Sequence, residues 1–324
     1  RKKFQHAINK QTEGSKACDK RAFFIVFAQQ CYNYKYYMEF FAQIIINSIA
    51  AGAIYALFAI GFSLIYKTTK FFNLAYGTIT LIGGYITLLC YKTFSINIFL
   101  AALLGVLFTG VVGYFSDKLI FKKLRANGSS NTVLLIASLG LATVIQSLLA
   151  IFFTNQFQTL SSNTGTYTTY TLFGGIITET QILILISLLF VSVFVIFLKR
   201  SFLGKKIEAI SDSEEVSKII GINTDKIIGN TFFIGSVIGG LACILIGMDT
   251  GINPNMGTDF LLKGVTASII GGVGNLYGGV IGGLLIGLIE NFSVWQFSGE
   301  WKDAITFIIL ILFLLFRPNG IFKK

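Results

Sequence analysis

Long apolar segments alternate with short polar segments along most of the chain. Most of these segments are long enough to cross roughly 30 Å of hydrocarbon as an α-helix, which takes about 20 residues. The strict alternation of outer-membrane β-barrel strands is absent. The apolar spans cover residues 40–66, 71–90, 95–115, 132–153, 181–198, 227–247 and 303–316. With the glycine-rich stretch described next, this pattern predicts an all-α polytopic transmembrane bundle of about eight helices.

A further apolar stretch, 260–292, is interrupted by glycines at its centre. Each arm has only about 12 to 15 residues, too few to cross a bilayer without tilt or local thinning. We therefore expect a broken pair of helices, either a re-entrant hairpin or an unusually short pair, whose exposed backbone is shielded by protein or a water-filled cavity. The glycines of this predicted hairpin are Gly271, Gly272, Gly274, Gly278 and Gly279.

Basic residues are distributed unevenly between the polar segments. The longest polar segment, 199–226, carries six Lys or Arg residues, which places it in the cytoplasm by the positive-inside rule. Alternating the side at each span puts 15 Lys or Arg residues inside and only 2 outside. The loops 66–71 and 116–131 and the C-terminal tail are then cytoplasmic.

Residues 1–37 do not fit this pattern. They carry eight Lys or Arg residues, although the alternation of sides puts them outside. The apolar run 22–28 is too short to span a membrane and is unlike a signal peptide. We therefore expect residues 1–37 to be a non-native or mis-called leader, and 38–324 to form a single transmembrane domain that starts at Met38.

Composition excludes several classes of protein. Apolar residues make up 54% of the chain and charged residues 13%, whereas soluble domains carry about a quarter charged residues. The four cysteines have no CxxC spacing and His6 is the only histidine, so a metal site is not expected. The net charge of +11 is explained by topology signals rather than by nucleic-acid binding.

The sequence carries no recognisable catalytic or nucleotide-binding motif. Gly204-Lys205 lacks the upstream glycine and the following Ser or Thr of a phosphate-binding loop. No Ser, His and Asp set and no carboxylate pair forms a plausible hydrolase. We therefore expect a protein that is not an enzyme, binds no cofactor and has no ATP site of its own.

Few polar side chains interrupt the apolar spans. We expect Asn47, Tyr55, Asn73 and Tyr76 to line a translocation path. Glu290 lies near an outer helix end, where a solvated carboxylate is expected. Because no row of ionisable groups lies at membrane depth, self-contained ion-coupled transport is disfavoured.

Small residues recur at four-residue spacing, as in Gly52 and Ala56, Gly235 and Gly239, and Gly279, Gly283 and Gly287. Such stripes let transmembrane helices approach closely. We expect tight packing here, with a sliding or gating surface as the alternative.

The polar segment 199–226 contains a short amphipathic helix. Asp212 or Ser213 is expected to cap a helix over 214–220, and Gly221 to end it. Its apolar residues share one face. The helix is predicted either to dock on a soluble partner or to rest on the membrane surface.

Four further stretches are informative when they are taken in order: 40–57, 73–85, 218–223 and 271–283 with the tail 317–322. Together they resemble the LivH-type permease subunits of branched-chain amino-acid ABC importers. The resemblance covers nearly all of 38–324 and implies two permease subunits, two cytoplasmic ABC ATPases that bind the ATP, and an extracytoplasmic solute-binding protein, in the bacterial inner membrane. It also implies coupling to the ATPase through 199–226. The implied coupling residues are Glu208, Ala209, Glu215, Val216, Ile219, Ile220, Gly221 and Ile222.

The chain departs from the family pattern at two places. Tyr76-Gly77-Thr78 stands where the family commonly has His-Gly-Glu, and Val216-Ser217 where it has two alanines. The solute therefore stays open, with urea and short amides as alternatives to leucine, isoleucine and valine. A passive channel filtered by the glycine hairpin is the rival from another class, and a membrane-embedded enzyme would need a polar cluster that the sequence lacks.

Overall fold

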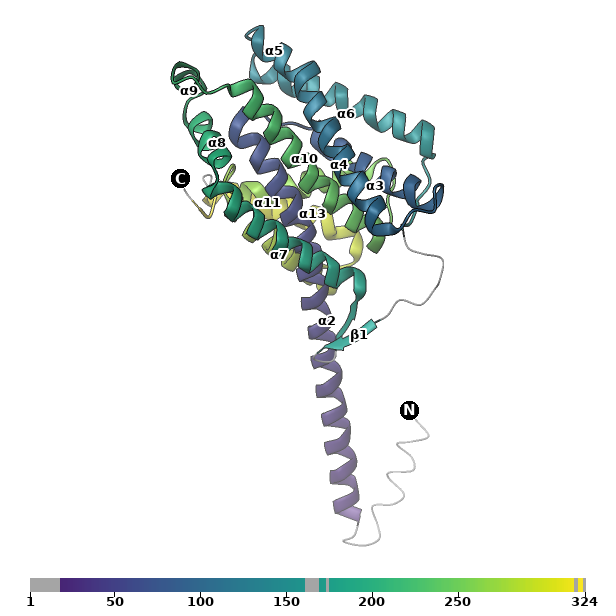
Figure 1. Cartoon of the computed structure of the whole chain (residues 1–324). Helices are drawn as coiled ribbons and strands as arrows, with labels where there is room; N and C mark the ends of the chain where they lie inside the picture. Colours follow the sequence, from purple (N-terminus) through teal and green to yellow (C-terminus); the bar gives the residue numbers. More distant parts are fainter. Residues whose placement is uncertain (1–17, 161–168, 173–174, 318–319, 323–324) are drawn as a thin grey trace.

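The computed structural model describes residues 18–160, 169–172, 175–317 and 320–322. Within them the chain forms an α-helical bundle with one small β-hairpin (Figure 1). Six of its helices are long and apolar enough to cross a membrane, which confirms the predicted polytopic class. The helices are α2 Cys18–Thr69, α3 Ala75–Lys92, α4 Ile98–Ser116, the π-helical η1 Asp117–Phe121, α5 Lys122–Ala126, α6 Asn131–Phe153, α7 Glu179–Arg200, α8 Phe202–Asp212, α9 Glu214–Ile219, α10 Thr224–Asp249, α11 Met256–Gly271, α12 Leu276–Gln296, the 3-10 helix η2 Gly299–Trp301 and α13 Lys302–Phe316.

The segment expected to be a leader is only partly described. Residues 1–17 lie outside the described residues, and α2 runs without a break from Cys18 into the bundle. The two strands, β1 Thr169–Leu172 and β2 Gly175–Thr178, pair antiparallel just before α7.

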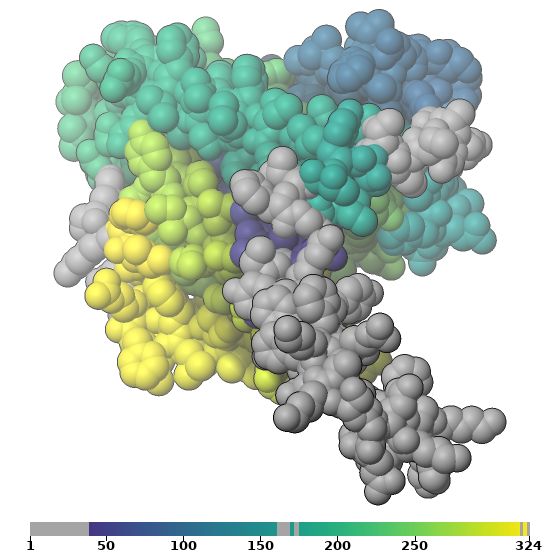
Figure 2. All heavy atoms as spheres, turned by 90° about the horizontal axis from the view of Figure 1, so that it is seen from below, coloured from purple at the N-terminus to yellow at the C-terminus, as the bar shows by residue number. Residues whose placement is uncertain are grey.

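Helix α2 is the central element of the bundle. The apolar part of α2 is 89% buried and that of α10 is 72% buried, whereas the corresponding parts of α4, α6 and α7 are each less than 30% buried. The outer helices instead expose large apolar side chains, as a lipid-facing surface requires. These include Leu103, Phe115, Ile136, Phe152, Phe190 and Phe197. Figure 2 shows this arrangement from one end, with yellow α13 beside α12 on one flank and blue α4 on the other.

The small-residue stripes are packing surfaces in this structure. Gly52 and Ala56 of α2 face Gly283 and Gly287 of α12, and a Cβ added at either α12 glycine would meet the backbone of α2. Close backbone approach of this kind is the usual means of holding transmembrane helices together. The expectation of tight packing is therefore confirmed for this helix pair.

The glycine-rich stretch forms two helices that are longer than the sequence predicted. Helix α11 has 16 residues and α12 has 21, so α12 alone is about 32 Å long. The expected arms were too short because polar residues at both flanks join the helices, and because Gly278 and Gly279 lie inside α12. Only residues 272–275 form the turn, with Gly272 and Gly274 at positive φ.

The C-terminal tail closes this turn. The amide of Ile321 donates to the carbonyl of Ile270 at 2.9 Å, and the amide of Phe322 donates to that of Gly271 at 3.3 Å. Gly320, at positive φ, packs directly on Gly272. The tail thus satisfies the last carbonyl groups of α11, which have no partner within the helix.

Most basic residues gather at one end of the bundle, which we call the basic end. Here α2, α5 and α7 end and α10 begins, and α8 and α9 cover it (Figure 1). An ion pair of 3.2 Å between Lys122 and Asp225 joins α5 to α10. The β-hairpin, the α10–α11 connection and η2 lie at the opposite end. The loops that were predicted to share one side therefore do lie together.

Candidate translocation path and coupling surface

The four residues expected to line a path lie at successive depths along the bundle. Asn47 is nearest the opposite end, where its side-chain oxygen accepts hydrogen bonds from Gln43 and from Gln181 of α7, both at 3.1 Å. It is half-buried. The Asn47 side chain thus links α2 to α7 at the end of the bundle opposite the basic end.

Tyr55 and Tyr76 lie deeper and are linked by aromatic rings. Tyr55 packs against Phe260 with ring centroids 6.3 Å apart, and Phe260 stacks on Phe58 at 5.8 Å. Phe58 then meets Tyr76 edge-on at 6.3 Å. The Tyr76 hydroxyl donates to the carbonyl of Gly235 at 3.3 Å, so it holds α3 against α10.

Asn73 lies nearest the basic end, at the start of α3. Its side-chain oxygen accepts from the amide of Ala75 at 3.1 Å, while its amide nitrogen is buried and has no hydrogen-bond partner within the described part of the chain. Asn73, Tyr55 and Tyr76 are each no more than 3% exposed. In this conformation only Asn47 of the four residues is therefore accessible to solvent, and the expected path is closed between Asn47 and the basic end.

A cluster of charged side chains lies beside Tyr55, which we call the charge cluster. It comprises Lys263 of α11, Glu290 of α12, and Lys302 and Asp303 of α13. Glu290 Oε1 accepts from Lys263 Nζ at 2.8 Å and from Lys302 Nζ at 3.1 Å, and Lys263 Nζ lies 3.0 Å from Asp303. The Lys263 ammonium lies 5.5 Å from the centre of the Tyr55 ring.

The expectation that Glu290 is a solvated carboxylate is wrong, because its side chain is fully buried. Glu290 does lie near a helix end, but α13 folds over that end and brings Lys302 onto Glu290 and Asp303 onto Lys263. Lys263 was the signal that sequence reasoning missed. A lysine within an apolar span needs a partner at the same depth.

The short helix predicted over 214–220 is present as α9, Glu214–Ile219. Ser213 accepts a hydrogen bond from the amide of Val216 at 3.3 Å and caps the helix, and Gly221 ends it at a φ of 87°. The Lys218 ammonium donates a hydrogen bond to the Glu214 carboxylate at 2.7 Å, and this bond raises the pKa of Lys218, so Lys218 stays charged at neutral pH.

Helix α9 presents an apolar face to solvent at the basic end. Val216, Ile219 and Ile220 are 52%, 84% and 70% exposed. Glu215 and Gly221 are also exposed. Exposed apolar residues this close together are typical of a surface that contacts another protein or the membrane, so both predicted roles of this helix stay open.

Helix α8 connects this face to the bundle. Its residues Ile207 and Ile210 pack in a buried cluster with Leu64 of α2, Leu198 of α7 and Ile227 of α10. The expected coupling residues Glu208 and Ala209 lie half-buried on the same helix, and Ile222 packs against the cluster. A movement of α8 would therefore be transmitted to α2.

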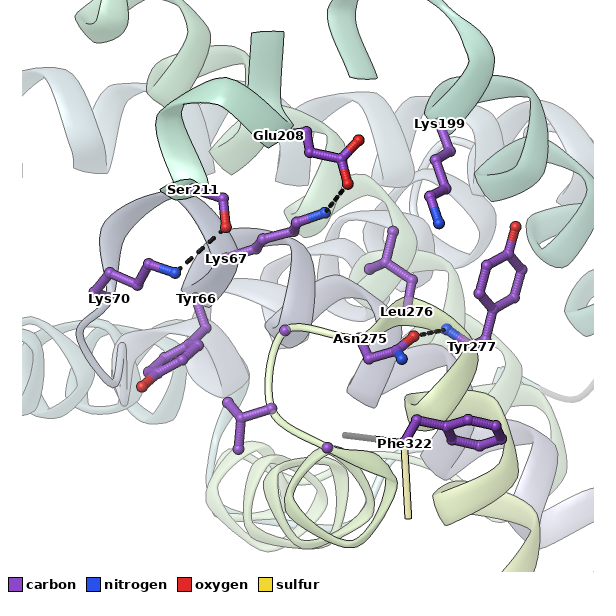
Figure 3. Close-up of a pocket in the computed structure, with 13 residues that line it drawn as sticks. Tyr66, Lys67, Lys70, Lys199, Glu208, Ser211, Asn275, Leu276, Tyr277 and Phe322 are labelled. Atoms are coloured by element: carbon purple, nitrogen blue, oxygen red, sulfur yellow. Dashed lines mark hydrogen bonds and ion pairs between the residues drawn. The ribbon is translucent and has the colours of Figure 1, made fainter. Parts of the chain in front are cut away.

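A cavity of about 580 Å³ opens between α8, the end of α2 and the α11–α12 turn (Figure 3). Lys67 lies 4.0 Å from Glu208, and Lys70 donates to Ser211 at 3.3 Å, so both lysines tie α2 to α8. Asn275 caps α12 by accepting from the amide of Tyr277 at 3.1 Å. The glycine turn thus forms a wall of this cavity at the basic end.

The chain is similar to known transport proteins over most of its length. The family described as "Branched-chain amino acid transport system / permease component" matches residues 44–314. BraD of Pseudomonas aeruginosa, a high-affinity branched-chain amino acid transport system permease protein, is 31% identical over 88% of this chain and 96% of its own. LivH of Escherichia coli K12, which bears the same description, is 29% identical over the same shares.

One solved structure, "PsaBC from Streptococcus pneumoniae in complex with Fab", covers 86% of this chain and 92% of its own, at 12% identity and a TM-score of 0.49. The matches to BraD and LivH extend from end to end of those proteins, and the matched family segment spans the bundle from α2 to α13. The chain therefore belongs to the permease-component family of branched-chain amino acid transport systems.

Proposed function

We propose that the chain is a membrane-spanning permease subunit of an ABC importer that carries leucine, isoleucine and valine. The names of its relatives support this assignment of the solute. Its partners would be a second permease subunit, cytoplasmic ABC ATPases and an extracytoplasmic solute-binding protein. In this arrangement the basic end faces the cytoplasm, in agreement with its excess of Lys and Arg.

The observation that carries the proposal is the exposed apolar face of α9. A soluble ATPase subunit would cover Val216, Ile219 and Ile220 and so remove them from water. Because α8 packs on α2 and is joined to it through Lys67 and Lys70, displacement of α9 would move the central helix. Asn47, Tyr55, Asn73 and Tyr76 would then line the path that opens along α2.

The solute-binding protein would dock at the opposite end. There the β-hairpin is held to α2 by Gln43, whose side chain bonds the amide and the carbonyl of Ile176 at 2.8 and 3.1 Å. Helix α2 therefore spans both docking regions. A single element would relay the state of the ATPases to the entrance.

The test is purification of the complex through a tag on the ATPase, with Val216→Asp/Ile220→Asp in this chain. We expect the double variant to lose ATPase association and leucine uptake, because two carboxylates would be desolvated at the interface. The matched control, Ala126→Asp/Asn127→Asp, adds the same charge at an exposed site on the basic end and should keep both. Full association of the α9 variant, or solute flux without any ATPase, would contradict the proposal in favour of a passive channel.

A further inference from the structure

The two oxygens of the Glu290 carboxylate differ in their hydrogen-bond partners. Both lysine ammonium groups of the charge cluster bond to Oε1, whereas Oε2 is buried and has no hydrogen-bond partner among the described residues. Buried polar atoms usually have a partner, because desolvation of an acceptor is otherwise not offset. The Tyr55 side chain also interacts with the Glu290 carboxylate, but among the described residues no group makes a hydrogen bond to Oε2.

The charge cluster also leads from solvent into the protein. The exposed fraction of the side chain falls from 65% at Asp303 to 36% at Lys302, 13% at Lys263 and 0% at Glu290. In space the contacts follow a different order, Asp303–Lys263–Glu290–Lys302. Opposite charges alternate along this row, and each contact is 3.1 Å or less. A molecule that carries both signs of charge could exchange ion pairs stepwise along it.

An apolar surface lies next to these charges. Tyr55 lies below the Lys263 ammonium, and Phe260, one helical turn before Lys263, packs on Tyr55. A molecule held by Lys263 and Glu290 would find aromatic rings for an aliphatic side chain. The arrangement thus offers a cation, an anion and an apolar surface within one site.

We propose that the charge cluster binds the zwitterionic head group of an α-amino acid during its passage. Glu290 Oε2 accepts hydrogen bonds from the α-ammonium group, and Lys263 donates to the α-carboxylate in exchange for its bond to Asp303. This proposal rests on the proposed function, and it distinguishes amino acids from urea and short amides. Neutral solutes of that kind have no charge to exchange with either residue.

The binding step can be followed at the two tryptophans of this chain, because each is close in sequence to a residue of the cluster. Trp295 follows Glu290 on the same helix, and Trp301 precedes Lys302. The complex of permeases and ATPases, labelled with 5-fluorotryptophan and free of binding protein, would be titrated by fluorine NMR. Trp301→Phe identifies one resonance, and Trp295→Phe the other.

We expect L-leucine at about 10 mM, enough to populate a weak site, to shift at least one of these resonances. At the same concentration 4-methylpentanoate, which lacks the ammonium group, and 3-methylbutylamine, which lacks the carboxylate, should leave both unchanged. Glu290→Gln should abolish the leucine shift. Equal shifts with all three molecules, no shift with leucine, or a shift that persists in Glu290→Gln would overturn the proposal.

Uptake measurements separate binding from a purely structural ion pair. Glu290→Gln should lower ATP-driven leucine uptake at least about tenfold, the loss expected when one charged contact is removed. Glu300→Gln, an exposed carboxylate at the same end, should leave uptake unchanged. If the wild-type complex itself did not take up leucine, the result would instead contradict the proposed function.

The double variant Lys263→Met/Glu290→Met decides between the two roles. Removing both members of a buried ion pair together is often neutral for stability. A structural pair therefore predicts that the double variant recovers uptake, whereas head-group binding predicts that uptake stays low in a complex that elutes intact on size exclusion. Recovery to within twofold of wild type would overturn the proposal.

Discussion

Single glycines decide how closely the central helices meet. Gly283 lies directly on the backbone of Ala56, so no side chain fits between α2 and α12 there. Gly140 of the lipid-facing helix α6 has no atom within 4 Å of the position where a Cβ would be. The stripe of small residues is visible in the sequence, but which glycines face a neighbour depends on the packing.

Gly283→Leu should therefore destabilise the bundle by about 1–3 kcal/mol, because a side chain would force α2 and α12 apart. We expect a lower melting temperature of the purified chain in detergent, measured by tryptophan fluorescence. Gly140→Leu adds the same side chain to a lipid-facing surface and should leave the melting temperature unchanged or raise it. Equal melting temperatures for the two variants would contradict this account of the helix contact.

At the scale of elements, the helices were predictable wherever apolar length alone defines them. The structure differs from the prediction where polar residues continue a helix, as Asn291 and Gln296 do in α12, or where a helix tolerates internal glycines. The burial of Glu290 was missed for a related reason. Its partners come from two other helices, Lys263 lying 27 residues away, and hydropathy carries no information about which helix ends meet.

The α11–α12 turn depends on its cap. Asn275→Ala should lower stability by about 0.5–2 kcal/mol, because the amides of Tyr277 and Gly278 lose their acceptor. Asn131→Ala is the control, since Asn131 is exposed at the start of α6 and Ser130 provides the side-chain cap of that helix. Thermal unfolding of both variants would test this, and an equal effect of the two substitutions would show that the cap contributes little.

At the scale of the whole molecule, the distribution of charge predicts which loops lie together at one end of the bundle. That this end faces the cytoplasm is our proposal. Residues from 66–71, 116–131 and 199–226 do gather at the basic end, where Lys122 pairs with Asp225 and Lys67 with Glu208. The four expected path residues span the bundle between its two ends. Their closure in this conformation could not be predicted, because it depends on how α3, α10 and α11 pack on α2.

The orientation can be tested by labelling single cysteines in a chain whose four cysteines have been replaced by serine. Asn127→Cys at the basic end should react with an impermeant maleimide only after the cells are opened, because that end is proposed to be cytoplasmic. Ser298→Cys at the opposite end should react in intact cells. Both sites are exposed, and labelling of both in opened cells is the control. The reverse pattern would invert the orientation.

The contact between the C-terminal tail and α11 affects the order in which the chain can be completed. Ile270 and Gly271 obtain their hydrogen-bond donors from Ile321 and Phe322, about fifty residues later in synthesis. During translation, α11 and α12 can insert and pair, yet the end of α11 stays uncapped until Ile321 and Phe322 emerge. The basic end is thus completed only after these residues have left the ribosome, so a premature stop just before Gly320 would leave an inserted bundle in which the end of α11 lacks these hydrogen bonds.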